Sequence, residues 1–284
     1  MRLRSLLFVP GDRPERFDKA VASGADALIL DLEDAVAEER KPGARANVAA
    51  FLAARPPAPC LVRVNPLDSP LLALDVAALA ATPPAGVVLP KAAGASAITT
   101  LFARHGATLG PARILPIATE TAAALFQLGS YGEVADRLLG LTWGAEDLPA
   151  AIGARTARHP DGSYTPPFEL VRALALFAAH AAGVAAIETV FPGLDDLDGL
   201  ARYVGNARRD GFGGMLAIHP RQVGPINAGF TPDAAEVAQA RAVVEAFAAA
   251  PGRGAVRFAG RMLDRPHLLH ARRLLSQAGE DAGE

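Results

Sequence analysis

Residues 27–34, Ala27-Leu28-Ile29-Leu30-Asp31-Leu32-Glu33-Asp34, give the clearest indication of how this chain folds. An apolar run of this length, too short for a helix, predicts a buried strand of a parallel sheet. Its acidic residues fall at the carboxyl end, where the loops of a parallel barrel carry functional groups. The stretch therefore predicts a strand that leads into a polar site.

Similar short runs recur along the chain and predict eight strands: Ser5–Val9, Ala27–Leu32, Cys60–Val64, Gly86–Leu89, Arg113–Ile117, Leu138–Trp143, Val184–Val190 and Met215–Ile218. Stretches with helical spacing separate them, for example Pro14–Ala22, Ala44–Ala54 and Phe168–Ala182. This alternation is typical of repeated β-α units, and eight units predict a closed (β/α)₈ TIM barrel of the α/β class. An open doubly wound sheet is the alternative, but no G-x-G-x-x-G follows the first run.

The barrel is expected to occupy residues 1–228 and a C-terminal helical extension to occupy residues 229–284. Thr231-Pro232-Asp233 predicts the start of one helix, Ala255–Phe258 a short extended piece, and Pro266 the start of a second helix. The extension is too small to form a complete domain alone. We expect it either to pack on the barrel or to reach a neighbouring subunit as a lid.

The composition argues for a small-molecule enzyme of the cytoplasm. The chain has 284 residues, 51% of them hydrophobic, and a formal net charge of −2 with scattered basic residues. These values argue against a surface that binds nucleic acid and against a polybasic segment that anchors the chain to a membrane. Cys60 is the only cysteine, so neither an intrachain disulfide nor a cysteine-based zinc site is expected. The first apolar run stops at Pro10-Gly11, and we interpret it as a strand rather than a signal peptide.

Nearly every predicted strand places a titratable group at one rim: Asp31, Glu33, Asp34, Arg63, Lys91, Glu120, Glu146, Asp147, Glu188 and His219. Each alone fits a solvated loop or a helix cap, but their joint placement indicates a site. Carboxylates from successive strand ends suit Mg²⁺, which prefers one or two protein carboxylates. We expect Glu120 and Asp147 to bind the metal, and Asp31, Glu33 and Asp34 to bind waters around it. No partner spacing identifies His219 as a ligand.

Seven segments in order resemble the citrate lyase beta-subunit-like proteins of the HpcH/HpaI aldolase superfamily: Arg4–Gly11, Leu30–Val36, Val62–Asn65, Leu89–Lys91, Ile117–Thr121, Trp143–Leu148 and Ala217–Gln222. The resemblance covers essentially the whole chain. It implies a (β/α)₈ barrel, a homotrimer or hexamer, and Mg²⁺ at the positions of Glu120 and Asp147. It also implies that Arg63 and Glu120 contact the substrate.

The resemblance further implies cleavage of a citryl-, malyl- or citramalyl-type thioester, on coenzyme A or acyl-carrier protein, into an acetyl-type thioester and a 2-oxoacid. Arg63 would balance negative charge during the reaction. Residues 258–266 are similar to a segment that carries an acid/base residue in relatives, which makes Asp264 the candidate, with a helix N-cap as its other interpretation. Glu188 departs from the family pattern, where we expect an aspartate.

Two alternatives to the lyase remain open. The same pocket suits a thioester hydrolase, and a non-catalytic subunit that binds a carrier protein would share the resemblance. A pyruvate-type aldolase has less support, because no E-x-x-x-D pattern surrounds Glu120. Fold analogy alone does not choose between these activities.

Overall fold

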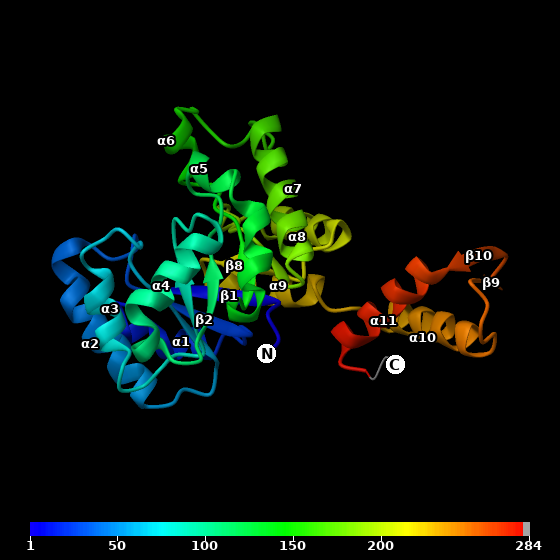
Figure 1. The fold of residues 1–284 in the computed structure, drawn as a ribbon, viewed down its shortest axis with the longest axis horizontal. Coiled ribbons are helices and arrows are strands. Elements are labelled where there is room, and N and C mark those ends of the chain that lie inside the picture. Colours follow the sequence, from blue (N-terminus) through cyan, green and yellow to red (C-terminus); the bar gives the residue numbers. More distant parts are fainter. Residues whose placement is uncertain (281–284) are drawn as a thin grey trace. The chain divides into compact units, whose positions relative to one another are not determined.

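A computed structural model describes residues 1–280 and divides the chain into two compact units, Met1–Asn227 and Ala228–Glu284 (Figure 1). The first unit contains eight parallel strands: β1 Ser5–Pro10, β2 Ala27–Asp31, β3 Cys60–Arg63, β4 Gly86–Leu89, β5 Arg113–Pro116, β6 Gly140–Thr142, β7 Ala185–Glu188 and β8 Gly214–Ala217. Their order is β5-β4-β3-β2-β1-β8-β7-β6. Each strand except those at the β5–β6 seam pairs with two neighbours.

The β5–β6 seam is closed by sparse backbone pairing. Two isolated bridges, Ile114 with Leu138 and Ile117 with Thr142, link the two end strands. The Leu139 N–H donates to Ile114 O at 2.8 Å and the Ala118 N–H donates to Thr142 O at 2.9 Å. These contacts complete a nearly closed ring, and the predicted (β/α)₈ barrel is confirmed.

Helices follow the strands around the barrel: η1 Pro14–Arg16, α1 Phe17–Val21, η2 Glu38–Arg40, α2 Lys41–Ala53, α3 Leu72–Ala78, α4 Gly94–Leu109, α5 Ala122–Leu125, η3 Leu128–Arg137, α6 Leu148–Ile152, α7 Pro166–Ala181, α8 Leu197–Asp210 and α9 Pro220–Gly229. Figure 1 shows α2, α3 and α8 outside the strands. No helix within residues 1–280 has the length and apolarity needed to cross a bilayer.

Side chains from the strands fill the barrel interior. One buried cluster joins residues of seven strands: Leu6, Ala27, Ile29, Leu61, Val88, Leu115, Ile187 and Leu216. All five residues of β2 are buried, because one side of the strand faces this interior and the other faces the helices. The apolar core therefore stops at the carboxyl ends of the strands, where the polar residues begin.

The second unit has its own small core. It consists of α10 Ala234–Ala248, β9 Ala255–Phe258, β10 Arg261–Asp264 and α11 Arg265–Ala278. The helices α10 and α11 lie side by side (Figure 1) and bury residues such as Val243 and Leu275. The strands β9 and β10 form an antiparallel hairpin, of which only the first strand was expected.

Candidate functional site at the strand ends

The turn after β2 is shaped by Asp31. Its carboxylate accepts hydrogen bonds from the backbone N–H of Glu33 at 2.9 Å and of Ala35 at 3.2 Å. Asp31 is fully buried and Glu33 is 2% exposed, whereas Asp34 is exposed. The three acidic residues therefore differ in role: Asp31 fixes the turn, Glu33 points inward and Asp34 stays at the surface.

Arg63, at the end of β3, pairs with the acidic turn. Its Nε donates to Asp31 Oδ1 at 2.7 Å and its Nη2 to Asp31 Oδ2 at 2.5 Å, while Nη1 lies 2.9 Å from Glu33 Oε2. The Phe8 ring lies 4.8 Å from the guanidinium carbon. Burial lowers the pKa of Arg63, but the pairing with Asp31 outweighs burial and raises it, so the guanidinium stays charged.

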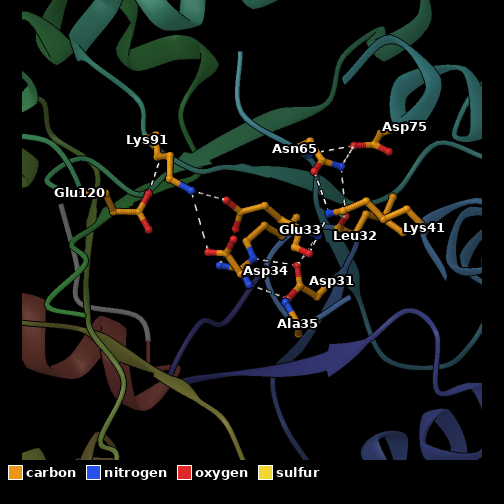
Figure 2. Close-up of polar contacts among 11 residues, drawn as sticks. Asp31, Leu32, Glu33, Asp34, Ala35, Lys41, Asn65, Asp75, Lys91 and Glu120 are labelled. Atoms are coloured by element: carbon orange, nitrogen blue, oxygen red, sulfur yellow. Dashed lines mark hydrogen bonds and ion pairs between the residues drawn. The ribbon is translucent and has the colours of Figure 1, made fainter. Parts of the chain in front are cut away.

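Lys91 lies between two carboxylates (Figure 2). Its backbone N–H donates to Glu120 Oε2 at 2.5 Å, and its Nζ donates to Glu33 Oε1 at 2.7 Å and lies 3.9 Å from Asp34 Oδ2. Its φ of 52° is in the left-handed region, which non-glycine residues seldom adopt. Burial lowers the pKa of Lys91, but Glu33 outweighs this effect and raises it, so the ammonium is charged.

Glu120 follows β5 and is 4% exposed. Burial raises the pKa of its carboxyl to about 8; the hydrogen bond from Lys91 opposes this shift, and the negative charge of nearby Asp147 adds to it. Gly144 provides the space for this side chain, because a Cβ at that position would lie 2.6 Å from Glu120 Cγ. The folded chain thus holds a buried carboxylate close to a second one.

Asp147 precedes α6, yet its side chain makes no capping hydrogen bond. The charge of Asp147 acts on Glu120, and neither carboxylate forms an ion pair within residues 1–280. Two such carboxylates match the donor set of a hard divalent cation that completes its shell with water and substrate oxygens. Glu33 Oε2 is buried and paired in charge with Arg63 Nη1 at 2.9 Å, but no donor is aligned with it for a hydrogen bond, which leaves an acceptor for such a water. The residues present therefore fit the expected ion.

No group of three or more His, Cys, Asp or Glu in the described part of the chain could hold a metal ion by itself. A site of two carboxylates, as expected for Glu120 and Asp147, would be open to water and substrate, unlike the closed ligand set of a structural metal. His219 makes a local contact: its Nδ1 accepts from the Arg221 N–H at 3.2 Å, as in a helix start. No metal-binding role for His219 follows.

Glu188 has a different environment from the other strand-end carboxylates. Its Oε1 accepts from Trp143 Nε1 at 2.5 Å and from the Thr189 N–H at 2.9 Å, and its Oε2 accepts from Arg172 Nε at 2.7 Å. The side chain is fully buried. Glu188 therefore joins β7 to β6 and α7, and its carboxylate is occupied by protein donors.

Asp264 belongs to the second unit, at the junction of β10 and α11. Its exposed carboxylate lies 2.5 Å from His267 Nδ1, at the start of the helix. Arg63, Glu120 and the acidic turn are brought together in the first unit, whereas Asp264 is in the other. Its assignment as an acid/base residue stays a prediction.

Sequence reasoning missed two lysines. Lys91 was placed at the rim without a role, and Lys41 was not selected at all. Lys41 is 8% exposed, and no local pattern in the sequence predicts its burial, because lysines are seldom buried.

Comparisons with known proteins agree with this architecture. Residues 4–220 match the family model described as HpcH/HpaI aldolase/citrate lyase. A citrate lyase subunit beta-like protein of Mycobacterium tuberculosis is 40% identical over 281 residues, covering 98% of this chain and 96% of that protein. A (3S)-malyl-CoA thioesterase of Cereibacter sphaeroides is 32% identical, covering 97% and 94%.

A solved structure of a related protein has the same fold. The protein CitE from Mycobacterium tuberculosis, in complex with magnesium, acetoacetate and coenzyme A, superimposes with a TM-score of 0.82 at 37% identity. The match covers 98% of this chain and 100% of that one. By sequence and by fold, the chain belongs to the HpcH/HpaI aldolase/citrate lyase family.

Proposed function

We propose that the protein is a Mg²⁺-dependent carbon–carbon lyase that cleaves a β-hydroxyacyl thioester into an acetyl-type thioester and a 2-oxoacid. The observation that carries this proposal is the placement of Glu120 beside Asp147, with Arg63 and Lys91 at the same rim. Glu120 and Asp147 would hold the ion and Glu33 would bind its waters, while Asp31, whose two oxygens are occupied by Arg63 and the turn, positions Glu33 and Asp34. The magnesium and coenzyme A complex of the related CitE protein supports both ligands.

The reaction combines the cleavage of one carbon–carbon bond with two proton transfers. The β-hydroxyl of the substrate gives its proton to the acid/base residue, for which Asp264 is the candidate; the bond between the α- and β-carbons breaks, and its electron pair moves to the α-carbon, which gives the enolate of the thioester. That enolate then takes up a proton. When bound, Mg²⁺ supplies Lewis-acid stabilisation of the hydroxyl oxygen as it becomes a carbonyl.

The chain's own residues orient the substrate and balance its charge. Arg63 presents a fixed planar donor group, because Asp31 holds two of its nitrogens. Together with Lys91 it would face the carboxylate of the substrate. Charges placed before the reaction need no reorganisation during it, and this contributes several kcal/mol in a water-poor site.

Asp264 is our candidate for protonating the enolate from a neighbouring subunit of a homotrimer or hexamer. Mixing two inactive variants tests whether a neighbouring subunit supplies Asp264. If Arg63→Met and Asp264→Asn are each inactive, their co-refolded mixture should recover part of the wild-type activity, because some sites then combine an intact Arg63 with an intact Asp264. Recovery that stays at zero in a correctly sized oligomer would remove the shared site.

Product analysis tests the function itself. Purified protein is incubated with Mg²⁺ and citryl-, malyl- or citramalyl-coenzyme A, with and without chelator, and the products are measured by mass spectrometry. We expect one thioester to give acetyl-coenzyme A and its 2-oxoacid only when the metal is present. No reaction with any of them would reject the coenzyme A lyase and direct attention to acyl-carrier protein.

A thioester hydrolase is the second candidate, favoured by the 32% identity to a malyl-CoA thioesterase. The same products distinguish it: free hydroxyacid and coenzyme A without a 2-oxoacid indicate hydrolysis. A 2-oxoacid accompanied by free coenzyme A would instead indicate cleavage followed by hydrolysis.

A further inference from the structure

Helix α2 directs two cationic side chains inward beneath the acidic turn. Lys41 and Arg45 lie one helical turn apart, and both are buried. Arg45 Nε donates to Asp75 Oδ1 at 2.7 Å, so its charge is paired. Lys41 has no carboxylate among its hydrogen-bond acceptors in the part of the chain that the structure describes. A buried ammonium with neutral acceptors is costly, so its contacts require an explanation.

The Lys41 ammonium makes three hydrogen bonds of equal length. Nζ donates to Leu32 O, to Glu33 O and to Asn65 Oδ1, each at 2.8 Å. Three donors therefore meet three acceptors, which is the full capacity of the group. Two of these acceptors are backbone carbonyls of the acidic turn, and Figure 2 shows them converging on the lysine.

Asn65 fixes the position of this ammonium. Its backbone N–H and Nδ2 donate to Asp75 Oδ2 at 2.8 and 2.6 Å, and Nδ2 also donates to Leu32 O at 3.0 Å. This arrangement leaves Asn65 Oδ1 directed at Lys41. Arg45, Asp75, Asn65 and Lys41 thus form one continuous chain of hydrogen bonds that ends on the turn.

The other side of the turn carries the side chains that face the site. Glu33 lies between Arg63 and Lys91, and Lys91 in turn donates its backbone N–H to Glu120. The backbone of Glu33 is held by Lys41, and its side chain is held by the two site cations. Movement of the carbonyls would therefore move the carboxylate.

We propose that Lys41 is a positioning residue: it holds the carbonyls of Leu32 and Glu33 so that the Glu33 carboxylate meets Lys91 and Arg63. The effect of Lys41 on catalysis rests on the proposed function, whereas the effect of Lys41 on the conformation of the turn does not. Removing a group that only supports the residues around a metal costs about 10–100-fold in affinity or activity. We expect a loss in this range for Lys41→Met.

The first test measures the turn directly by hydrogen exchange in the full chain. Lys41→Met, which keeps the length of the side chain, should speed exchange of the Glu33 and Ala35 amides roughly tenfold or more, the factor expected for loss of a hydrogen bond to a charged group. The matched control is Arg40→Met, one residue earlier, where an exposed cation contacts Asp12 at 3.1 Å. We expect exchange in residues 31–36 of that variant to match the wild type. Lys41→Gln replaces Lys41→Met if the latter does not fold.

The second test is a double-mutant cycle on kcat/KM. If Lys41 acts through Glu33, Lys41→Met should cost much less in a Glu33→Gln background than in the wild type, because coupled residues are not additive. Thermal unfolding of the same four proteins reports any purely structural loss. Additive effects on kcat/KM, or unchanged exchange in residues 31–36, would overturn the proposal. A wild-type protein without turnover rejects the proposed reaction, and the exchange result then decides the role of Lys41.

Discussion

Lys91 contacts Glu120 through its backbone and Glu33 through its side chain, with N–O distances of 2.5 and 2.7 Å. One residue thus joins the carboxylate proposed to bind metal to the carboxylate proposed to bind its waters. Lys91→Met should keep the first contact and lose the second. We expect kcat/KM to fall about tenfold or more, because Glu33 keeps only Arg63 as a cationic partner.

The same experiment needs a control that removes a cation elsewhere. Among the residues that the structure describes, Arg209, which is exposed on α8, makes a single hydrogen bond, to Asn206 Oδ1 at 2.9 Å. Arg209→Met should leave kcat/KM at the wild-type value. Equal losses in both variants would show that net charge, rather than the position of Lys91, determines the effect.

Glu120→Ala and Asp147→Asn should each abolish Mg²⁺-dependent turnover. Each variant removes one of two carboxylates, so the loss in Mg²⁺ affinity should exceed the about 10–100-fold typical of supporting residues. Calorimetric titration measures the affinity and a steady-state assay measures turnover. Full activity in either variant would exclude that residue as a ligand.

Gly144→Ala should weaken the site without removing any of its functional groups. The added Cβ would meet Glu120 Cγ at 2.6 Å, so the carboxylate must move. We expect a lower Mg²⁺ affinity and a lower kcat/KM. Gly205→Ala in α8 is the control, because a Cβ there would meet no described atom within 4 Å other than its chain neighbours and the nearby backbone of its own helix. It should keep activity and stabilise the helix by roughly 0.5–1 kcal/mol.

The pH dependence of stability should include a contribution from Asp26. Its carboxylate accepts from Arg4 Nε and Nη2 at 2.9 and 2.7 Å and from the Arg4 N–H at 2.8 Å. Burial raises the pKa of Asp26, but these bonds outweigh burial and lower it. A lowered carboxyl pKa stabilises the fold above the unfolded value of about 3.9, and this contribution is lost as pH falls through the folded value.

Asp26→Asn isolates that contribution. Urea unfolding should show the variant less stable than the wild type by about 1–3 kcal/mol at pH 7. The difference should shrink as pH falls below about 4. A constant difference over this range would mean that the ionisation of Asp26 does not contribute.

Glu188→Asp should destabilise the protein. The shorter side chain cannot reach both Trp143 and Arg172, so one buried donor loses its partner at a cost of about 1–3 kcal/mol. Asp210→Asn breaks the exposed contact of Arg172 and should cost less than about 1 kcal/mol. The ranking of the two variants in urea unfolding checks this expectation.

The eight strands could be predicted because each is a buried run with no periodicity of its own, bounded by polar residues. Six of the predicted ranges end within about one residue of the observed bounds, and β6 and β7 are shorter than expected. The strand β10 was missed. Its hairpin turns at Ala259 and Gly260, with φ values of 47° and 77°. Alanine is uncommon there, so the usual Asn-Gly or Asp-Gly signal is absent.

The candidate site could be predicted only in part. Acidic residues at strand ends identify the rim, because the parallel order of the strands places those ends together. The contacts of Lys41 depend on which carbonyls the turn directs inward, and those of Glu188 depend on the packing of α7 against β7. Neither has a local sequence signal. The tertiary structure therefore determines which groups these two long side chains contact.

The sparse β5–β6 seam has a consequence for how the barrel responds to its ligand. Glu120 follows β5 and Asp147 follows β6, so any ion shared by the two carboxylates would cross-link the ring where backbone pairing is weakest. Saturation at 100 times the dissociation constant adds about 2.7 kcal/mol of stability in general. At this seam the gain would fall where the ring has the fewest backbone hydrogen bonds, so that an ion bound by both carboxylates would also hold β5 and β6 together.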